Sequence, residues 1–433
     1  MKDEDKSFLK SNAVVFISNL ITSVGSYIIV ILASRILQTD YSSWVALSGA
    51  VSIFATFTNG VQTSTTKNIS KNSDNPSQVI NLIEFYDQNL FKLLLLGVLI
   101  SPVIALILNS FRVDFSFLVV FLISLHFFCS PFFSYKQFAL LSLSRTWEYS
   151  ILNVISAFFR LIFSFLILIL GFKLLALPAG LILSLVIVFY ISTIFLTNHL
   201  KKILNQKESS KEMKNTTPIK FNSEIKHLVL NTLSTLGLIL FLNIGPIIIQ
   251  LSNLKNESKD LLAILFSFGQ IIHFGAISAV GTLIVSAAKS SNKNIYLWSV
   301  GIVGSISGFI ACLFLFFGKA IMEIFGREQF SWAIWLVFLY AIYILLYNII
   351  FVTIQYQISR NQYLSSWVLI LGVITQLSYL FLTNLGIFKF QLLSNSSNLE
   401  TTNQLLPYIV LNIATAAVTL ILTIFLARKN PNN

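Results

Sequence analysis

Apolar segments of roughly 20 residues recur along the whole chain, and this recurrence limits the fold more than any other feature. Of the 433 residues, 55% are hydrophobic and 11% are charged, which is more apolar surface than a soluble core can hide. A membrane-spanning β-strand has about 10 residues of alternating polarity, a pattern these segments lack. The sequence therefore predicts an all-α integral membrane protein. About twelve transmembrane helices are expected, near 13–37, 41–66, 88–109, 115–140, 150–172, 174–197, 226–251, 261–287, 296–318, 331–357, 364–388 and 404–427.

The placement of basic residues predicts how these helices are oriented. If the N-terminus is cytoplasmic, 20 of the 29 Lys and Arg residues fall on the inner side, 8 on the outer side, and Arg160 lies inside a helix. This bias satisfies the positive-inside rule. The first apolar segment is too long for a signal-peptide core and is expected to remain in the protein. We therefore expect a multi-pass protein of the cytoplasmic membrane with both termini in the cytoplasm, and no nucleic-acid partner for the net charge of +12.

One long polar segment, 198–225, divides the chain into two sets of six helices. It is rich in lysine, so we interpret it as a cytoplasmic linker between an N-terminal lobe, 1–197, and a C-terminal lobe, 226–433. The first helix of each lobe carries the pattern N-x-x-[ST]-[ST]-x-G, starting at Asn19 and at Asn231. Two pseudo-symmetric six-helix lobes with a shared pattern are typical of transporters built from internal repeats.

Polar side chains form stripes along the first two segments. At 100° per residue, Ser52, Thr56 and Asn59 share one arc with other hydroxyl residues of the second segment. Unsatisfied polar groups are costly in hydrocarbon, so these stripes should face protein or water. Close helix packing explains the Ser and Thr residues, whereas the larger amides favour a hydrated cavity. The expected cavity residues from these stripes and the matching seventh helix are Asn19, Ser23, Ser52, Thr56, Asn59, Gln62 and Asn231.

The fifth segment carries the sharpest single feature, an arginine near the middle of the bilayer. Arg160 follows Asn153 and Ser156 on one helical face. An ionisable residue at this depth is a functional candidate, and a guanidinium fork suits phosphate oxygens. The alternative is a structural tie to the carbonyls of a neighbouring helix. His126 and His273 are also mid-segment; each is either a packing residue or a proton relay, and His273 is included among the cavity candidates.

Several functional classes lack the residues they need. No acidic residue falls well inside a predicted segment, although cation-coupled pumps usually keep a buried carboxylate there. No phosphate-binding glycine loop, metal-spaced His or Cys pair, or nucleophile–base pair is present. We therefore expect no enzymatic activity, no catalytic residue, no metal site and no cofactor.

Three short motifs resemble a known family. They are Arg35-Ile-Leu-Gln-Thr-Asp40-Tyr41, the segment Ile324-Phe-Gly326-Arg-Glu-Gln-Phe330, and Ile358-Ser-Arg360-Asn. Together with the helix spacing, they are similar to polysaccharide-biosynthesis membrane proteins. These are lipid-linked oligosaccharide flippases of the multidrug/oligosaccharidyl-lipid/polysaccharide (MOP) exporter superfamily. Ser42, where the family often has Gly, and Ala287-Ala288, where it often has Pro, depart from the pattern.

The resemblance implies a flippase that works by alternating access. Its expected cargo is a polyprenyl-pyrophosphate-linked oligosaccharide, the repeat unit of a polysaccharide, and its expected partners are the lipid bilayer and other polysaccharide-assembly membrane proteins. A cation-coupled exporter of drugs or metabolites in the same superfamily is the first alternative. A membrane polysaccharide polymerase is the second, and the short external loops argue against it.

Overall fold

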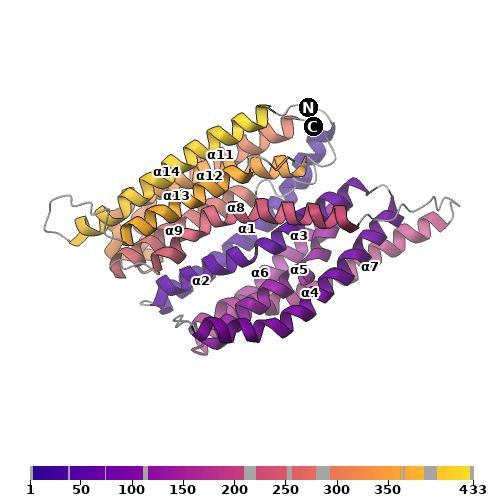
Figure 1. Cartoon of the computed structure of the whole chain (residues 1–433), viewed down its shortest axis with the longest axis horizontal. Helices are drawn as coiled ribbons and strands as arrows, with labels where there is room; N and C mark the ends of the chain where they lie inside the picture. Colours follow the sequence, from indigo (N-terminus) through magenta and orange to yellow (C-terminus); the bar gives the residue numbers. More distant parts are fainter. Residues whose placement is uncertain are drawn as a thin grey trace. The chain divides into compact units, whose positions relative to one another are not determined.

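The computed structural model describes residues 3–37, 40–73, 75–110, 116–208, 221–250, 256–278, 293–360, 362–363, 366–384 and 397–429. Every regular element in these ranges is a helix (Figure 1). The α-helices are α1 (Asp3–Leu37), α2 (Tyr41–Phe54), α3 (Thr56–Lys71), α4 (Pro76–Ser110), α5 (Phe117–Ser142), α6 (Thr146–Ile169), α7 (Ala176–Glu208), α8 (Phe221–Gln250), α9 (Asn256–Ile277), α11 (Lys293–Ile324), α12 (Ile334–Ser359), α13 (Ser366–Asn384) and α14 (Ser397–Lys429). Short 3-10 turns occur at Lys173–Leu175 and Glu328–Ala333.

The predicted all-α membrane fold is confirmed. Within the described ranges, eleven helical spans are long and apolar enough to cross a bilayer, and a shorter apolar helix covers Trp367–Ser378. Large apolar side chains such as Leu99, Leu170 and Phe316 are exposed, as expected for helices that face lipid. The predicted linker 198–225 is helical at both ends, because α7 continues to Glu208 and α8 begins at Phe221; residues 209–220 lie outside the described part.

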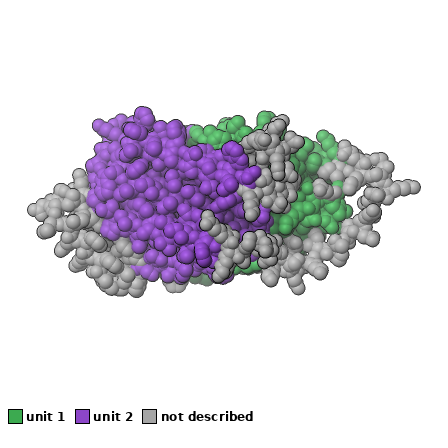
Figure 2. Space-filling view, turned by 90° about the horizontal axis from the view of Figure 1, so that it is seen from above, with its two compact units in different colours: residues 1–26, 54–235, 281–292 green, residues 27–53, 236–280, 293–433 purple. Residues whose placement is uncertain are grey.

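The described chain groups into two compact units, coloured separately in Figure 2. Unit 1 takes residues from 1–26 and 54–235, and unit 2 takes residues from 27–53, 236–280 and 293–433. These groups differ from lobes divided at the linker, because α1, α8 and the α2–α3 span contribute to both units. The boundaries of the two lobes therefore stay a prediction.

Each unit is built around one central helix. In unit 1, α5 packs against α3, α4, α6 and α7, and α6 packs against α7. In unit 2, α12 packs against α9, α11 and α14, and α13 packs against α14. When α2 and α3 are counted as one span, α5 is the fourth span and α12 is the tenth. The pairs α4·α5, α6·α7 and α5·α7 thus have counterparts six spans later in α11·α12, α13·α14 and α12·α14, which is the packing expected of an internal repeat.

The second predicted span is present as Tyr41–Lys71, and a turn interrupts its helix in the middle. α2 ends at Phe54, and α3 starts at Thr56 after a turn at Ala55. The hydroxyls of this span donate to their own helix: Ser52 Oγ lies 2.9 Å from the Ser48 carbonyl oxygen. Such bonds compete with the helical ladder and bend helices. The break divides the predicted polar stripe, leaving Ser52 in unit 2 and Asn59 in unit 1.

Two of the motifs that carried the family resemblance meet in unit 2. The Ser34 hydroxyl donates to the carbonyl of Phe325 at 2.8 Å, and Arg35 Nε donates to the carbonyl of Ile324 at 3.0 Å. These carbonyls end α11, where the backbone turns through Gly326 at a φ of +66°, a conformation that glycine adopts without strain. The side chains of α1 therefore cap the C-terminus of α11.

Arg327 completes this corner of unit 2. Its guanidinium is buried, lies 3.7 Å from the Asp260 carboxylate, and sits 5.1 Å from the centre of the Tyr41 ring. The Tyr41 hydroxyl in turn lies 2.8 Å from the Ser267 hydroxyl. Because these residues come from α2, α9 and the α11–α12 connection, the arginine joins three segments far apart in sequence. The motif positions thus have a structural role in this unit.

Candidate functional site

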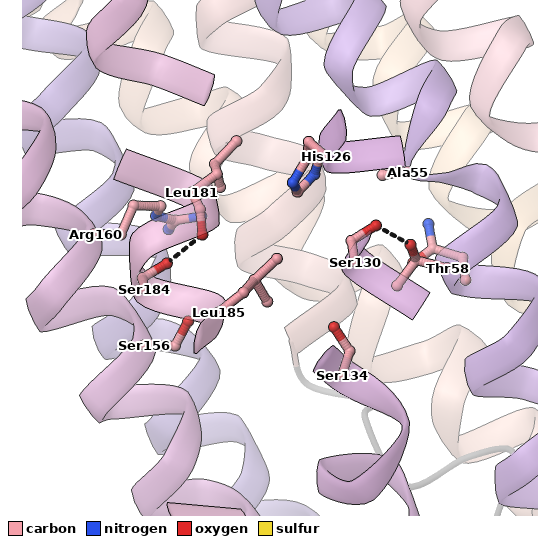
Figure 3. A pocket seen from close by; sticks show the side chains of 11 residues that line it. Ala55, Thr58, His126, Ser130, Ser134, Ser156, Arg160, Leu181, Ser184 and Leu185 are labelled. Atoms are coloured by element: carbon pink, nitrogen blue, oxygen red, sulfur yellow. Dashed lines mark hydrogen bonds between the residues drawn. The ribbon is translucent and has the colours of Figure 1, made fainter. Parts of the chain in front are cut away.

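Unit 1 contains a polar cavity of about 160 Å³ (Figure 3). Helices α3, α5, α6 and α7 line it, together with the turn at Ala55. Arg160 lies about 21 Å along the axis from Thr146, the first residue of α6, at about 1.5 Å per residue. That distance puts the cavity well inside the bilayer. Its lining residues are Ala55, Thr58, Asn59, His126, Ser130, Ser134, Ser156, Arg160, Leu181, Ser184 and Leu185.

Small hydroxyl side chains make up most of the polar lining. Thr58 of α3 and Ser130 of α5 are hydrogen-bonded to each other, and the Ser184 hydroxyl of α7 donates to the Leu181 carbonyl at 2.8 Å. A hydroxyl can donate or accept as its surroundings require. The cavity wall is therefore able to solvate an ion or a polar group deep in the membrane.

Arg160 supplies the charge of this cavity. Among the eleven lining residues it is the single charged side chain, and no carboxylate is present. One of its terminal nitrogens donates to the Ser26 hydroxyl of α1, a contact inside unit 1. This bond orients the guanidinium. The cavity is therefore electropositive, and an anion is the kind of ligand it favours.

The polar residues of α6 are also hydrogen-bonded to the polar residues of α1. Asn153, two turns before Arg160, donates to Asn19 Oδ1 at 2.9 Å. The Thr22 hydroxyl donates to the Asn153 carbonyl at 3.2 Å, and Gln137 donates to Asn153 Oδ1 at 2.5 Å. Asn19 is thus part of a hydrogen-bonded contact between α1 and α6 and does not line the 160 Å³ cavity.

His126 is the second candidate ligand in the lining. It is 5% exposed, and its Nδ1 is buried with no hydrogen-bond partner in the described part of the chain. In the view of Figure 3 it lies between Arg160 on one side and the Thr58–Ser130 pair on the other. Its side chain therefore borders the cavity with an unused polar atom.

The structure brings only two of the predicted cavity residues, Asn59 and Arg160, to this cavity. Thr56 and Asn231 are buried in unit 1, whereas Ser23 and Gln62 are half-buried there. Ser52 lies in unit 2. The assignment of these side chains to a cargo pathway stays a prediction.

His273 differs from His126 in its surroundings. It lies in unit 2, where its Nδ1 is 2.6 Å from Asn348 Oδ1, and Asn348 Nδ2 donates to the Ser307 hydroxyl at 2.9 Å. The ring also packs between Tyr347 and Phe351, with centroids 5.2 and 5.5 Å away. The hydrogen bond and ring contacts satisfy this side chain within unit 2, and its assignment to a cargo pathway stays a prediction.

Sequence reasoning considered His126 alone and missed the polar stripe of α5 to which it belongs. His126, Ser130 and Ser134 recur every four residues, so they share one helical face, and all three line the cavity. A helical-wheel comparison at 100° per residue, as used for the first two segments, also detects this stripe. Ser184 of α7 carries no comparable signal, because a single serine in an apolar helix is most often a packing residue.

Asp87 lies within α4, which begins at Pro76, eleven residues before it, and its side chain is 41% exposed. The Asp87 carboxylate lies 3.4 Å from Lys136 Nζ of α5, and Lys136 also packs over the Phe189 ring at 4.7 Å. A carboxylate is therefore available within unit 1, although it does not line the cavity. In the described ranges, no three His, Cys, Asp or Glu side chains are grouped as metal ligands.

Cysteine labelling tests whether water reaches the cavity. In a background without the native Cys129 and Cys312, we expect Asn59→Cys to react with a small, charged thiol reagent, because Asn59 lines the cavity. Phe57→Cys is the matched control; Phe57 packs against Phe127 at 5.9 Å and should be protected. Equal protection of both cysteines from the reagent would show that water does not reach the cavity.

Comparisons with known proteins address the fold. No protein-family model matches the chain, and no curated protein sequence matches it. Solved structures do match over the full length. A crystal structure of MATE in complex with MaD5 has 13% identity and a TM-score of 0.70, covering 100% of this chain and 98% of that one. An outward-facing multidrug resistance MATE family transporter of the MOP superfamily has 12% identity and a TM-score of 0.72 at the same coverage.

The description of a third match concerns that protein's own binding pocket. It is a MOP superfamily transporter from Pyrococcus furiosus, described as having a binding pocket of reverse polarity that suggests a different function. It is 12% identical, with a TM-score of 0.64, and the alignment covers 100% of this chain and 98% of that one. All three matches are membrane transporters, and at these identities they establish the fold alone. The chain has the fold of the MATE transporters of the MOP superfamily.

Proposed function

We propose that the protein is a flippase that moves a polyprenyl-pyrophosphate-linked oligosaccharide across the cytoplasmic membrane by alternating access. The observation that carries the proposal is the electropositive cavity of unit 1, where Arg160 is the one charged side chain in the lining. A pyrophosphate carried to the middle of the bilayer loses most of its hydration. A fixed guanidinium surrounded by hydroxyl groups replaces part of that hydration.

The size of the cavity limits which part of the cargo it accepts. A volume of about 160 Å³ corresponds to roughly five water molecules at about 30 Å³ each. One phosphate group with its remaining water fits such a space, whereas an oligosaccharide does not. We therefore propose that unit 1 recognises the anionic group shared by all cargoes of this class. On this view the protein tolerates different glycans, and the remaining predicted polar residues contact other parts of the cargo.

Export of small cationic compounds is the second candidate. Its support is the fold shared with a multidrug resistance transporter. Against it stands the charge of the cavity, because Arg160 repels a cation that enters. A polymerase or other enzyme has no observation in its favour.

Reconstitution into proteoliposomes distinguishes the two transport candidates. The assay compares movement of a fluorescent polyprenyl-pyrophosphate-linked oligosaccharide, detected by an impermeant quencher, with ethidium efflux under a proton or sodium gradient. We expect protein-dependent flipping of the glycolipid and no ethidium efflux. Ethidium efflux without flipping would overturn the proposal. In cells, we propose a cytoplasmic-membrane location with both termini inside, and association with other polysaccharide-assembly membrane proteins.

A further inference from the structure

We propose that His126 is a second ligand for the anionic group in the unit 1 cavity, so that the group is held by Arg160 of α6 and by the imidazole of α5. The inference rests on the proposed function, because it assumes that an anion enters this cavity. It goes further in assigning a binding role to His126, which the sequence presents only as a packing residue or a proton relay. It also defines the ligand as one phosphate-sized oxyanion.

The geometry of His126 supports this assignment. Both His126 and Arg160 line the same 160 Å³ space, but they come from different helices. Figure 3 shows the imidazole directed into the space between the α6 side and the α3 side. Ser130 and Ser134, one and two turns further along α5, extend its polar face. An oxyanion in this space therefore meets donors on several sides, as a tetrahedral phosphate requires.

The hydrogen bonding of His126 also points to a ligand. Its Nδ1 is buried and unpartnered in the described part of the chain, and leaving such an atom unsatisfied in the membrane is costly. By contrast, His273 has a side-chain partner, because its Nδ1 lies 2.6 Å from Asn348 Oδ1 and Asn348 donates to Ser307. Among the described residues, no side chain is hydrogen-bonded to His126 Nδ1, although Ser130 and Ser134 line the same cavity. An oxyanion that accepts a hydrogen bond from the imidazole supplies the missing partner.

Titration of the purified full-length protein in detergent with inorganic pyrophosphate tests the inference by calorimetry. We expect the wild-type protein to bind pyrophosphate and His126→Leu to bind it about 10- to 100-fold more weakly, the range for a lost hydrogen bond to a charged group. Arg160→Gln should weaken binding at least as much. His199→Leu is the matched control, because His199 lies on α7 in the same unit and does not line the cavity. Its affinity should equal that of the wild type.

Elution as a single species and an unchanged thermal unfolding midpoint confirm that each variant is folded. If His126→Leu does not fold, His126→Asn keeps a donor of smaller size and should bind with intermediate affinity. An unchanged affinity in a folded His126 variant overturns the inference, even when Arg160→Gln is defective. Absence of pyrophosphate binding by the wild type also overturns it. If pyrophosphate binds as expected but the glycolipid is not flipped, the proposed function fails and the anion site stands.

Discussion

Replacing Arg160 with glutamine is expected to slow glycolipid transport about 10- to 100-fold per molecule of protein in the membrane. Glutamine keeps polar atoms in the cavity but removes its one charged side chain. A charge-assisted hydrogen bond contributes about 1.5–3 kcal/mol. If the cargo loses one such bond at the rate-limiting point of transport, the barrier rises by this amount and the rate falls by about this factor. Complementation of a flippase-deficient strain, normalised to the amount of protein in the membrane, measures the effect.

Arg160→Lys separates the charge from the geometry of the guanidinium. Lysine keeps the positive charge but loses the planar fork, so its transport rate should be intermediate. Ser26→Ala is a control for a structural role, since the Ser26 hydroxyl accepts a hydrogen bond from Arg160 within unit 1. If the arginine served only the α1–α6 contact, all three variants would lower the protein level together. If Arg160→Gln has normal activity per molecule of protein, Arg160 stabilises the fold and does not bind the cargo.

The sequence was sufficient to predict the fold class and the approximate number of spans, because hydrocarbon imposes both composition and length on a membrane helix. It predicted the ends of the helices less well. The apolar segment near 88–109 predicts a membrane span, but the helix α4 itself begins at Pro76, because a helix can continue outside the hydrocarbon, where hydropathy gives no signal for it. The break at Ala55 has no proline or glycine next to it. Hydropathy alone gives no signal for this break.

The site was predicted only in part. Arg160 was identifiable because a charge in the middle of an apolar helix is unusual, and Asn59 because an amide is too polar for lipid. Asn19 carries the same signal, but the structure satisfies it with Asn153. A polar side chain in a membrane helix shows that a partner exists without showing whether the partner is a ligand or another helix. Only the three-dimensional arrangement separates Asn19 from Asn59 and His273 from His126.

Arg327→Leu is expected to reduce the stability of the protein by about 3 kcal/mol, near the lower end of the range for breaking a buried ion pair. The guanidinium is buried, and removing it leaves the partly buried Asp260 carboxylate without its cation. The variant also loses the contact over the Tyr41 ring and the bond from Arg327 Nε to the Ser34 hydroxyl at 3.3 Å. Arg35→Leu is the matched control. Arg35 binds carbonyls at the same corner but is exposed, so its loss should cost less than about 1 kcal/mol.

Thermal unfolding in detergent, with the double variant Arg327→Leu/Asp260→Asn, tests this ion pair directly. Asp260→Asn alone should be milder than Arg327→Leu, because the arginine keeps its contacts with Ser34 and Tyr41. Removing both charges should cost less than the sum of the single effects, since the second change removes an already unpaired group. Strictly additive losses would mean that the two charges do not interact. Equal losses for Arg327→Leu and Arg35→Leu would mean that burial of the guanidinium contributes nothing, and that both arginines act only as caps on the end of α11.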